Sequence, residues 1–201
     1  MREKYLVFTG RPNAGKSTIV RKITDLNIAI GKRPGTTRKI SRYPLNKGLV
    51  LVDLPGLGRM SGVSRKFEEK INQQIIEFLE ANAKKIVLAI LVFDISTFKE
   101  VTWRLEKKGF KSVDVEMAQF LADNLDEFPL IAANKIDKIN NEKLSENLNE
   151  FIFRVNKGFP GEFVKNIFTI SAKKEIGIGK LKSAIHQKLV AEGYKNPFKK
   201  S

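Results

Sequence analysis

A glycine-rich segment near the start of the chain has the residue types and spacing of a phosphate-binding loop. It consists of Gly10, Arg11, Pro12, Asn13, Ala14, Gly15, Lys16 and Ser17, with Thr18 directly after it. The glycines let the backbone curl so that its N–H groups face phosphate oxygens, and the helix that follows adds partial positive charge at its N-terminus. Lys16 is expected to reach the β- and γ-phosphates of a nucleotide, and Ser17 to offer its hydroxyl to Mg²⁺. The alternative, an unrelated glycine turn, is disfavoured by the flanking strand and helix patterns.

A second segment, at the end of the next central strand, carries a carboxylate and a glycine in the order that magnesium and phosphate binding require. It comprises Asp53, Leu54, Pro55 and Gly56. Asp53 can hold Mg²⁺ through water, and Gly56 lets its backbone N–H approach the γ-phosphate. A D-x-x-G pattern alone usually marks only a turn. Its place on a buried strand after the phosphate loop favours the functional interpretation.

The loop between these two segments contains hydroxyl groups that can complete a magnesium shell. Its candidate ligand-contacting residues are Gly35, Thr36, Thr37, Arg38 and Lys39. A threonine here can reach the metal only while the γ-phosphate is present, so the loop would order with the triphosphate and relax with the diphosphate. Thr37 is preferred to Thr36, and the alternative is that both are ordinary loop hydroxyls. The expected protein ligands of Mg²⁺ are therefore Ser17 and Thr37.

Two later segments have the groups needed to recognise a guanine base. The first comprises Asn134, Lys135, Ile136 and Asp137, and the second comprises Ser171, Ala172 and Lys173. Asp137 can accept hydrogen bonds from guanine N1–H and the 2-amino group, both of which adenine lacks, so adenine would leave a desolvated carboxylate unpaired. Asn134 is expected to tie its loop to the phosphate loop, and the Ala172 N–H to meet guanine O6. The lysine stems of both segments can cover the base. These segments predict GTP and GDP as ligands and disfavour ATP.

Apolar runs alternate with helical patterns along the whole chain. Strands are predicted at 5–8, 40–45, 49–52, 86–93, 130–133 and 167–170, and helices at 16–25, 64–83, 113–126, 141–157 and 178–191. This alternation predicts an α/β fold: a six-stranded, mostly parallel sheet with one antiparallel edge strand at 40–45 and helices on both faces. In such sheets the ligand lies beyond the carboxyl ends of the strands, where all the segments above are expected. Residues 1–191 would form one GTP-binding domain, and residues 192–201 a basic, frayed tail.

The charge of the chain favours polyanionic partners. Lys and Arg total 37 against 22 Asp and Glu, which gives a net charge of +15. Each phosphate that such a surface neutralises releases counterions, so RNA is the expected partner, although the charge alone is also compatible with a merely solubilising surface. No membrane partner is expected, because the longest apolar run, at 86–93, is far shorter than the roughly 20 residues that span a bilayer. With no cysteine and no apolar leader at the N-terminus, the expected location is the cytoplasm. A monomer is the expected oligomeric state.

In this order the segments resemble the EngB (YihA) family of the Era/EngA/TrmE-like, translation-factor-related P-loop GTPases, with loops like those of its archaeal branch. The resemblance covers nearly the whole chain and rests on GRPNAGKS, PGTTR, DLPG followed by LGRMSG, NKID and SAK. Era would add a C-terminal KH domain, EngA a second GTPase domain, and TrmE a long N-terminal part. The resemblance implies GTP hydrolysis as a switch in large ribosomal subunit assembly. The family is also labelled with cell division and septation.

One departure from Ras-like GTPases bears on catalysis. Leu57 stands where those proteins place the glutamine that orients the attacking water, so slow intrinsic hydrolysis is expected. In relatives of this group, an asparagine at the position of Asn13 helps to hold a potassium ion beside the phosphates, and the resemblance implies the same here. The alternative is that Asn13 only satisfies nearby backbone. Arg59 is a conceivable arginine finger, but a solvated loop arginine is the better interpretation. The catalytic candidates are thus Lys16, Asn13, Thr37 and Gly56.

Two other functions compete with ribosome assembly. One is a GTP-dependent regulatory module whose target is a cytoplasmic protein rather than rRNA. The other is a housekeeping hydrolase without a nucleotide-dependent partner. Salt-sensitive partner binding would favour RNA, whereas binding that survives nuclease treatment would favour protein.

Overall fold

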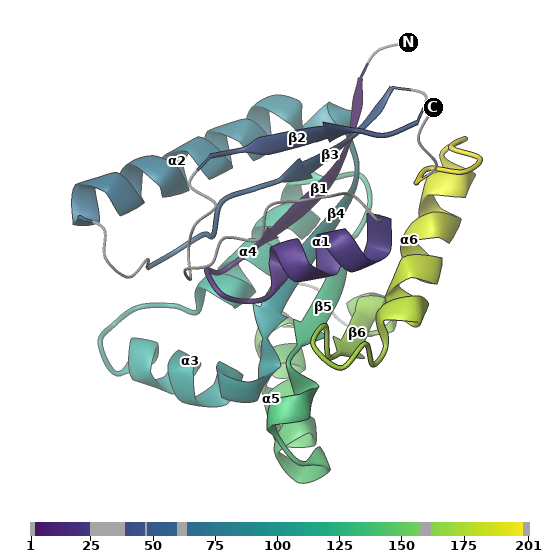
Figure 1. Cartoon of the computed structure of the whole chain (residues 1–201). Coiled ribbons are helices and arrows are strands. Elements are labelled where there is room, and N and C mark those ends of the chain that lie inside the picture. Colours follow the sequence, from purple (N-terminus) through teal and green to yellow (C-terminus); the bar gives the residue numbers. More distant parts are fainter. Residues whose placement is uncertain (1–2, 25–38, 47, 60–63, 157–161, 199–201) are drawn as a thin grey trace.

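A central six-stranded sheet lies between two layers of helices (Figure 1). The computed structural model describes residues 3–24, 39–46, 48–59, 64–156 and 162–198. The strands are β1 (Lys4–Gly10), β2 (Ser41–Pro44), β3 (Leu49–Asp53), β4 (Ile86–Asp94), β5 (Leu130–Asn134) and β6 (Ile167–Ile170), in the spatial order β2-β3-β1-β4-β5-β6. The edge strand β2 runs antiparallel to β3, and all the other pairs are parallel. The predicted fold class is confirmed.

Within the described residues, six α-helices lie between or after these strands, and five of them were expected from the sequence. They are α1 (Lys16–Thr24), α2 (Arg65–Asn82), α3 (Phe98–Glu106), α4 (Val113–Asn124), α5 (Asn141–Asn156) and α6 (Ile178–Ala191). Four short 3₁₀ helices accompany them: η1 (Ala83–Lys85), η2 (Ile95–Thr97), η3 (Ile136–Lys138) and η4 (Glu162–Asn166). The unexpected helix is α3, which places two helices in succession between β4 and β5.

Helix α3 has a narrow apolar stripe, which explains why it is hard to recognise in the sequence. Only Phe98 and Thr102, four residues apart, are fully buried on it. The Phe98 ring packs edge-on against Phe93 of β4 and Phe151 of α5, at centroid distances of 5.5 and 5.3 Å. The rest of α3 is largely exposed, including Trp103. Aromatic packing at one end of the helix therefore fixes it to the domain.

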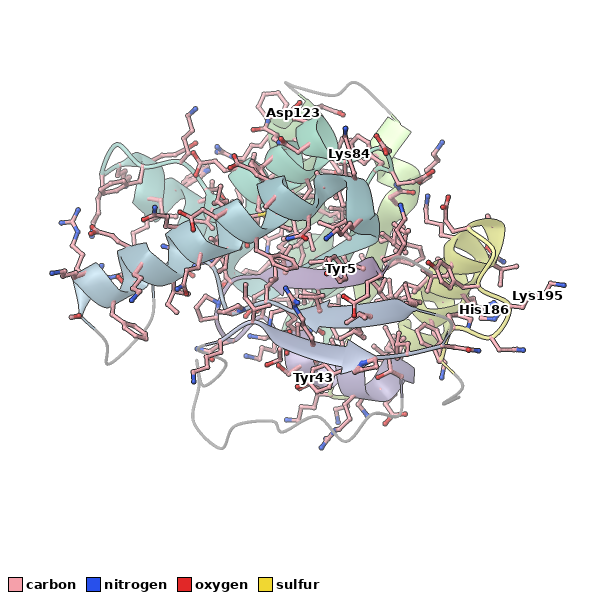
Figure 2. The ribbon with its side chains drawn as sticks, turned by 90° about the horizontal axis from the view of Figure 1, so that it is seen from above. Tyr5, Tyr43, Lys84, Asp123, His186 and Lys195 are labelled. Atoms are coloured by element: carbon pink, nitrogen blue, oxygen red, sulfur yellow. The ribbon has the colours of Figure 1, made fainter. Side chains whose placement is uncertain are left out.

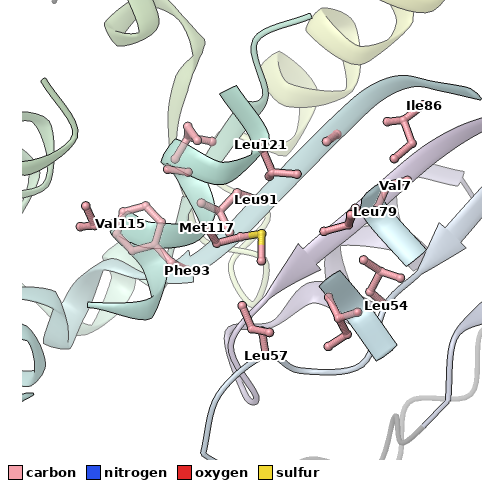
Figure 3. Close-up of a cluster of buried hydrophobic side chains, with 14 of the residues drawn as sticks. Val7, Leu54, Leu57, Leu79, Ile86, Leu91, Phe93, Val115, Met117 and Leu121 are labelled. Atoms are coloured by element: carbon pink, nitrogen blue, oxygen red, sulfur yellow. The ribbon is translucent and has the colours of Figure 1, made fainter. Parts of the chain in front are cut away.

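The central strands are buried on both faces, which explains their continuous apolar runs. Along β1, Tyr5 and Val7 point into the layer of α2, α4 and α5, whereas Leu6 and Phe8 point into the layer of α1 and α6. The first of these cores includes side chains from the sheet and α4, such as Leu91 and Met117 (Figure 3). With both faces covered, only the ends of the strands are open to a ligand.

The end of the chain, for which a frayed tail was expected, is packed in its described part. Tyr194 and Phe198 lie against the core beneath α1 and α6, and the Asn46 side chain donates a hydrogen bond to the Asn196 carbonyl oxygen at 3.3 Å. Lys195 projects outward beyond α6, on the same side as the exposed His186 (Figure 2). The described part of the predicted tail therefore packs against the domain through Tyr194 and Phe198. No helix within the described ranges has the length and apolar character needed to cross a bilayer.

Candidate nucleotide-binding site

Close backbone packing makes glycine necessary at two positions of the loop between β1 and α1. Gly10 has a φ of +144°, and a Cβ atom on it would lie 2.0 Å from the Val92 carbonyl oxygen of β4. Gly15 has a φ of +95°, and a Cβ atom there would lie 2.3 Å from Asn134 Nδ2. No other residue fits either place without moving a neighbour. The loop thus lies tightly against the carboxyl ends of the central strands, as the sequence predicted.

Lys16, Ser17 and Asp53 form one buried polar group at the base of this loop. Lys16 Nζ donates to Asp53 Oδ1 at 2.7 Å, and Ser17 Oγ donates to Asp53 Oδ2 at 3.1 Å. The side chains of Lys16 and Asp53 are only 6% and 2% exposed. A hydroxyl beside a carboxylate supplies the hard oxygen ligands that Mg²⁺ prefers, so these residues fit that ion. The ammonium has further N–H donors with which to reach phosphate oxygens.

The segment that begins at Asp53 runs directly over the phosphate loop. Leu57 N–H donates to the Gly10 carbonyl oxygen at 3.0 Å, and a Cβ atom on Gly56 would lie 2.7 Å from three atoms of Pro12. The Leu57 side chain is buried and points into the core near Met117 (Figure 3). An apolar side chain directed away from the loop cannot orient water. Next along the chain, the Gly58 N–H donates a hydrogen bond to Asn72 Oδ1 of α2 at 2.9 Å.

The Asn134 amide joins three of the predicted segments. Its Nδ2 donates to the Ala14 carbonyl oxygen at 2.8 Å, and its Oδ1 accepts from the Ala172 N–H at 2.9 Å. The first bond is the predicted tie to the phosphate loop. The second was not expected, because the Ala172 N–H was assigned to guanine O6. That role stays a prediction, and it requires this N–H to be shared between Asn134 and the base.

Asp137 and Ser171 meet where the two base-recognition segments come together. Ser171 Oγ donates to Asp137 Oδ1 at 2.5 Å and accepts from the Lys174 N–H at 3.0 Å. The hydroxyl hydrogen bond, aided by the nearby lysines Lys173 and Lys138, lowers the pKa of Asp137 below its ordinary value. Asp137 is exposed and ionised, so its free oxygen can accept from the donors of a base.

Lys135 has a partner that the sequence analysis missed. This residue adopts a left-handed backbone conformation, with a φ of +73°, and its Nζ donates to Asp94 Oδ2 at 2.6 Å. Asp94 is the last residue of β4, and its other oxygen accepts from the Ser96 hydroxyl at 2.6 Å. The hydrogen bond to Asp94 therefore fixes the Lys135 ammonium, and the methylene stem of Lys135 is held extended. An acidic residue at the carboxyl end of a central strand was the signal that could have identified Asp94.

A second missed residue, Asp114, lies under the phosphate loop. Arg11 Nη1 pairs with Asp114 Oδ2 at 3.5 Å, and Asp114 Oδ1 is buried with no hydrogen-bond partner among the described residues. Burial raises the pKa of Asp114 to about 6, although the Arg11 guanidinium opposes that rise. The ion pair connects the phosphate loop to the first turn of α4. An acidic residue in a first helical turn is common, so its position in the sequence does not distinguish Asp114 from others.

The remaining predicted residues lie either outside the described part of the chain or at exposed and half-buried positions within it. Residues 35–38, which include the candidate magnesium ligand Thr37, lie outside the described part of the chain, and Lys39 next to them is exposed. Asn13 is exposed in a left-handed conformation with a φ of +64°, and no described residue hydrogen-bonds to its side chain. Thr18 and Ile136 are half-buried, and Lys173 and Arg59 are exposed. The alternative role of Asn13, satisfying nearby backbone, is therefore not supported by the described residues.

The fold and this loop define a P-loop GTPase domain, and comparison with known proteins agrees. A family described as "50S ribosome-binding GTPase" matches residues 5–135. The probable GTP-binding protein EngB of Methanopyrus kandleri is 38% identical over 94% of each chain, and that of Pyrococcus horikoshii is 39% identical over 90% of this chain and 82% of its own. The chain belongs to the EngB family of GTP-binding proteins and is a GTPase.

Solved structures support the same assignment. The crystal structure of a probable GTP-binding protein EngB superposes with a TM-score of 0.81, at 37% identity, over 93% of this chain and 99% of its own. Era in complex with MgGDPNP and a fragment of 16S ribosomal RNA superposes with a TM-score of 0.60 at 22% identity, over 92% of this chain and 56% of that one. The likeness to Era shows the fold alone.

The pKa of Asp114 leads to a prediction for stability. Because it lies above the ordinary value of 3.8, the folded state holds the proton more tightly than the unfolded chain. This stabilisation is full below about pH 4 and is lost as the pH rises through about 6, by about 3 kcal/mol in total. We expect the free energy of unfolding of the wild type, relative to Asp114→Asn, to fall by that amount between about pH 3 and about pH 7, as measured by urea titration. Asp123→Asn, on the same helix, is the control, and a pH-independent difference for Asp114→Asn would refute the assignment.

Proposed function

We propose that this GTPase acts in assembly of the large ribosomal subunit and docks on ribosomal RNA while GTP is bound. The observation that carries the proposal is the net charge of +15 on a chain of 201 residues. So large an excess of positive charge favours a polyanionic surface. One comparison agrees with it: the matching family is described as "50S ribosome-binding GTPase". The place of action would be the cytoplasm, and the family label of cell division would follow from ribosome supply.

In this proposal, the phosphate loop and its buried polar group hold the nucleotide. Backbone N–H groups between Gly10 and Ser17 would bind the phosphates, and Lys16 would neutralise the β- and γ-phosphates. Ser17 and Thr37 would ligate Mg²⁺ directly, and Asp53 would hold it through water. The ion supplies charge neutralisation for phosphoryl transfer. The Gly56 N–H would contact the γ-phosphate, so the position of the segment that follows would depend on whether that phosphate is present.

Guanine specificity would rest on Asp137 and its surroundings. The carboxylate is held by Ser171 and kept ionised, so it can accept from both guanine donors. Lys135 and Lys173 would cover the two faces of the base with their stems, and the Ala172 N–H would meet guanine O6. A base without the two donors would desolvate the carboxylate and leave its other oxygen, which does not bind Ser171, without a donor.

A potassium ion beside the phosphates would compensate for the missing glutamine. The Leu57 side chain is buried in the core, so the hydrolytic step needs charge stabilisation from elsewhere. Asn13 is exposed at the tip of the phosphate loop, and its amide oxygen is free to ligate a monovalent cation. This arrangement supports slow hydrolysis that potassium stimulates.

A GTP-dependent module that acts on a cytoplasmic protein is the second candidate function, and one observation favours it. A groove of about 330 Å³ lies between α2, α4 and the segment after Gly56. Its lining is mainly apolar and includes Leu57, Ile76, Val113 and Phe120. A protein side chain seated there would contact the segment that responds to the γ-phosphate.

The base-recognition assignment predicts the effect of Asp137→Asn. An amide at this position cannot accept from both guanine donors, but it can donate to the 2-oxo group of xanthine. We expect GTP affinity to fall on the order of 100-fold and xanthosine triphosphate to become the preferred ligand. Competition titrations with the two triphosphates measure this, with Asp126→Asn as a control for removal of an exposed aspartate. An unchanged preference for GTP would show that the assignment is wrong.

The potassium proposal predicts a cation-dependent rate. GTP hydrolysis should be faster in potassium chloride than in sodium chloride, by on the order of 10-fold, and Asn13→Gly should abolish the difference. Glycine accepts the left-handed backbone at this position, so this variant removes the amide without the strain that alanine would add. Equal rates of GTP hydrolysis in both salts for the wild-type protein would refute the potassium proposal.

The ribosomal proposal is tested by co-sedimentation with large ribosomal subunits from the source organism. We expect pelleting with a non-hydrolysable GTP analogue, little pelleting with GDP, and loss of pelleting as salt rises. Equal pelleting in every nucleotide state would show that the positive charge causes only non-specific adhesion to the subunits. If nothing pellets with the subunits but a nuclease-resistant protein complex forms with the GTP analogue, the regulatory module is the correct function.

A further inference from the structure

The end of α3 presents an exposed phenylalanine among three lysines on a rigid turn. The residues that follow α3, from Lys107 to Lys111, have the sequence Lys-Lys-Gly-Phe-Lys. Phe110 N–H donates to the Leu105 carbonyl oxygen and Gly109 N–H to that of Glu106, at 3.0 and 2.9 Å. Gly109 has a φ of +75°. These two bonds around a left-handed glycine are a Schellman motif, which fixes the conformation of the turn. We name residues 107–111 the basic turn.

Phe110 is not explained as a structural residue of this motif. In Schellman motifs an apolar residue at this position commonly packs back on the helix. Here 61% of the Phe110 surface is exposed, which places it with Trp103 and Phe153 among the most exposed large apolar side chains that the structure describes. An aromatic ring held in water on a fixed turn has its faces available for another flat group. Burial in the core does not account for it.

The positive charge of the basic turn is uncompensated. Lys107, Lys108 and Lys111 are all exposed, and none of them pairs with a carboxylate in the part of the chain that the structure describes. The nearby acidic residues are already engaged. Glu106 accepts from Arg154 Nη2 at 3.1 Å, and Glu100 accepts from Arg104 at 2.5 Å. Three lysines therefore surround Phe110 without a local counterion.

We propose that the basic turn is a contact site for single-stranded RNA, with Phe110 stacking on an unpaired base and the three lysines contacting the adjoining phosphates. Single-stranded nucleic acids are bound by this combination of an aromatic platform and positive charge, because every base has a π face and every nucleotide a phosphate. An apolar partner would leave the three lysines unpaired, and an acidic peptide would pair with the lysines but would offer carboxylates rather than a flat base to the Phe110 ring. This proposal rests on the proposed function, in which RNA is the partner, and it assigns one RNA contact to the basic turn.

The position of the basic turn connects this contact to the nucleotide site. Directly after Lys111, Ser112 is buried and α4 begins. In the first turn of α4, Val113 lies beside Gly58 in the groove, and Asp114 pairs with Arg11 of the phosphate loop. RNA bound at the basic turn would therefore lie within one helical turn of Val113, which lines the groove with Gly58, and of Asp114, which pairs with Arg11.

The test measures binding of the full chain to an unstructured RNA of about 12 nucleotides, a typical length for a single-stranded site, by fluorescence anisotropy. Phe110→Leu, which keeps apolar bulk but removes the ring, should weaken binding about 5- to 100-fold, and Phe110→Trp should restore it. Phe153→Leu, which removes an equally exposed ring from α5, is the control. Equal binding by Phe110→Leu and the wild type would overturn the proposal, as would absence of binding by the wild type.

Charge substitutions separate a specific contact from general adhesion. Replacing Lys107, Lys108 and Lys111 together by glutamine should reduce the slope of log affinity against log salt by about 2, since each single-strand phosphate contact contributes about 0.7. The control replaces Lys165, Lys180 and Lys195, which are exposed on the α6 side of the domain. If both triple variants lower the slope equally, the basic turn is not the site.

Co-sedimentation of the same variants separates this proposal from the proposed function. If the wild type pellets with large subunits in the GTP state and Phe110→Leu pellets equally, the ribosomal role stands and the basic turn is wrong. If the wild type does not pellet but its oligonucleotide binding depends on Phe110, the RNA contact stands and the ribosomal role is wrong.

Discussion

The hydrogen bonds of one buried amide hold the nucleotide site together. Asn134 is 2% exposed, and its two polar atoms bind the backbone of the phosphate loop at Ala14 and of the last loop at Ala172. A buried amide with both ends engaged has little freedom, because each lost bond would leave an unpaired polar atom. The same side chain lies where a Cβ on Gly15 would be, so the loop can approach only with glycine there. Three segments distant in sequence are thus fixed in one geometry.

Much of the fold and of the candidate site was predictable because its causes are local. Strands buried on both faces appear as continuous apolar runs, and the loop, the D-x-x-G segment and the base-recognition segments each follow such a run directly. Helix α3 was not predictable in the same way. Its short apolar stripe ends in exposed residues, and its stability comes from Phe98 packing on Phe93 at the end of β4 and on Phe151, which is distant in sequence.

The partners of the site residues were the part that the sequence could not supply. Asp94 and Asp114 are ordinary acidic residues in the sequence, one at a strand end and one in a first helical turn. Their importance comes from Lys135 and Arg11, which the topology brings to them from other elements. Likewise, the bond from Ala172 N–H to Asn134 appears only when β5 and β6 lie side by side. Motif spacing selects the candidate ligand-binding residues, whereas the fold decides which side chains hold them in place.

Asp114 shows that this domain accepts a loss of stability next to its nucleotide site. One of its oxygens is buried without a partner and the other makes a long ion pair, so ionisation at neutral pH is costly. A well-packed apolar residue would avoid that cost, but it would leave Arg11 without its link to α4. The same first turn of α4 lines a groove together with the segment after Gly56, through Val113, and it follows directly on the basic turn. We therefore interpret the Arg11–Asp114 pair as fixing the phosphate loop relative to α4 at a cost in folding free energy. Such local losses of stability are common in sites that must respond to a ligand.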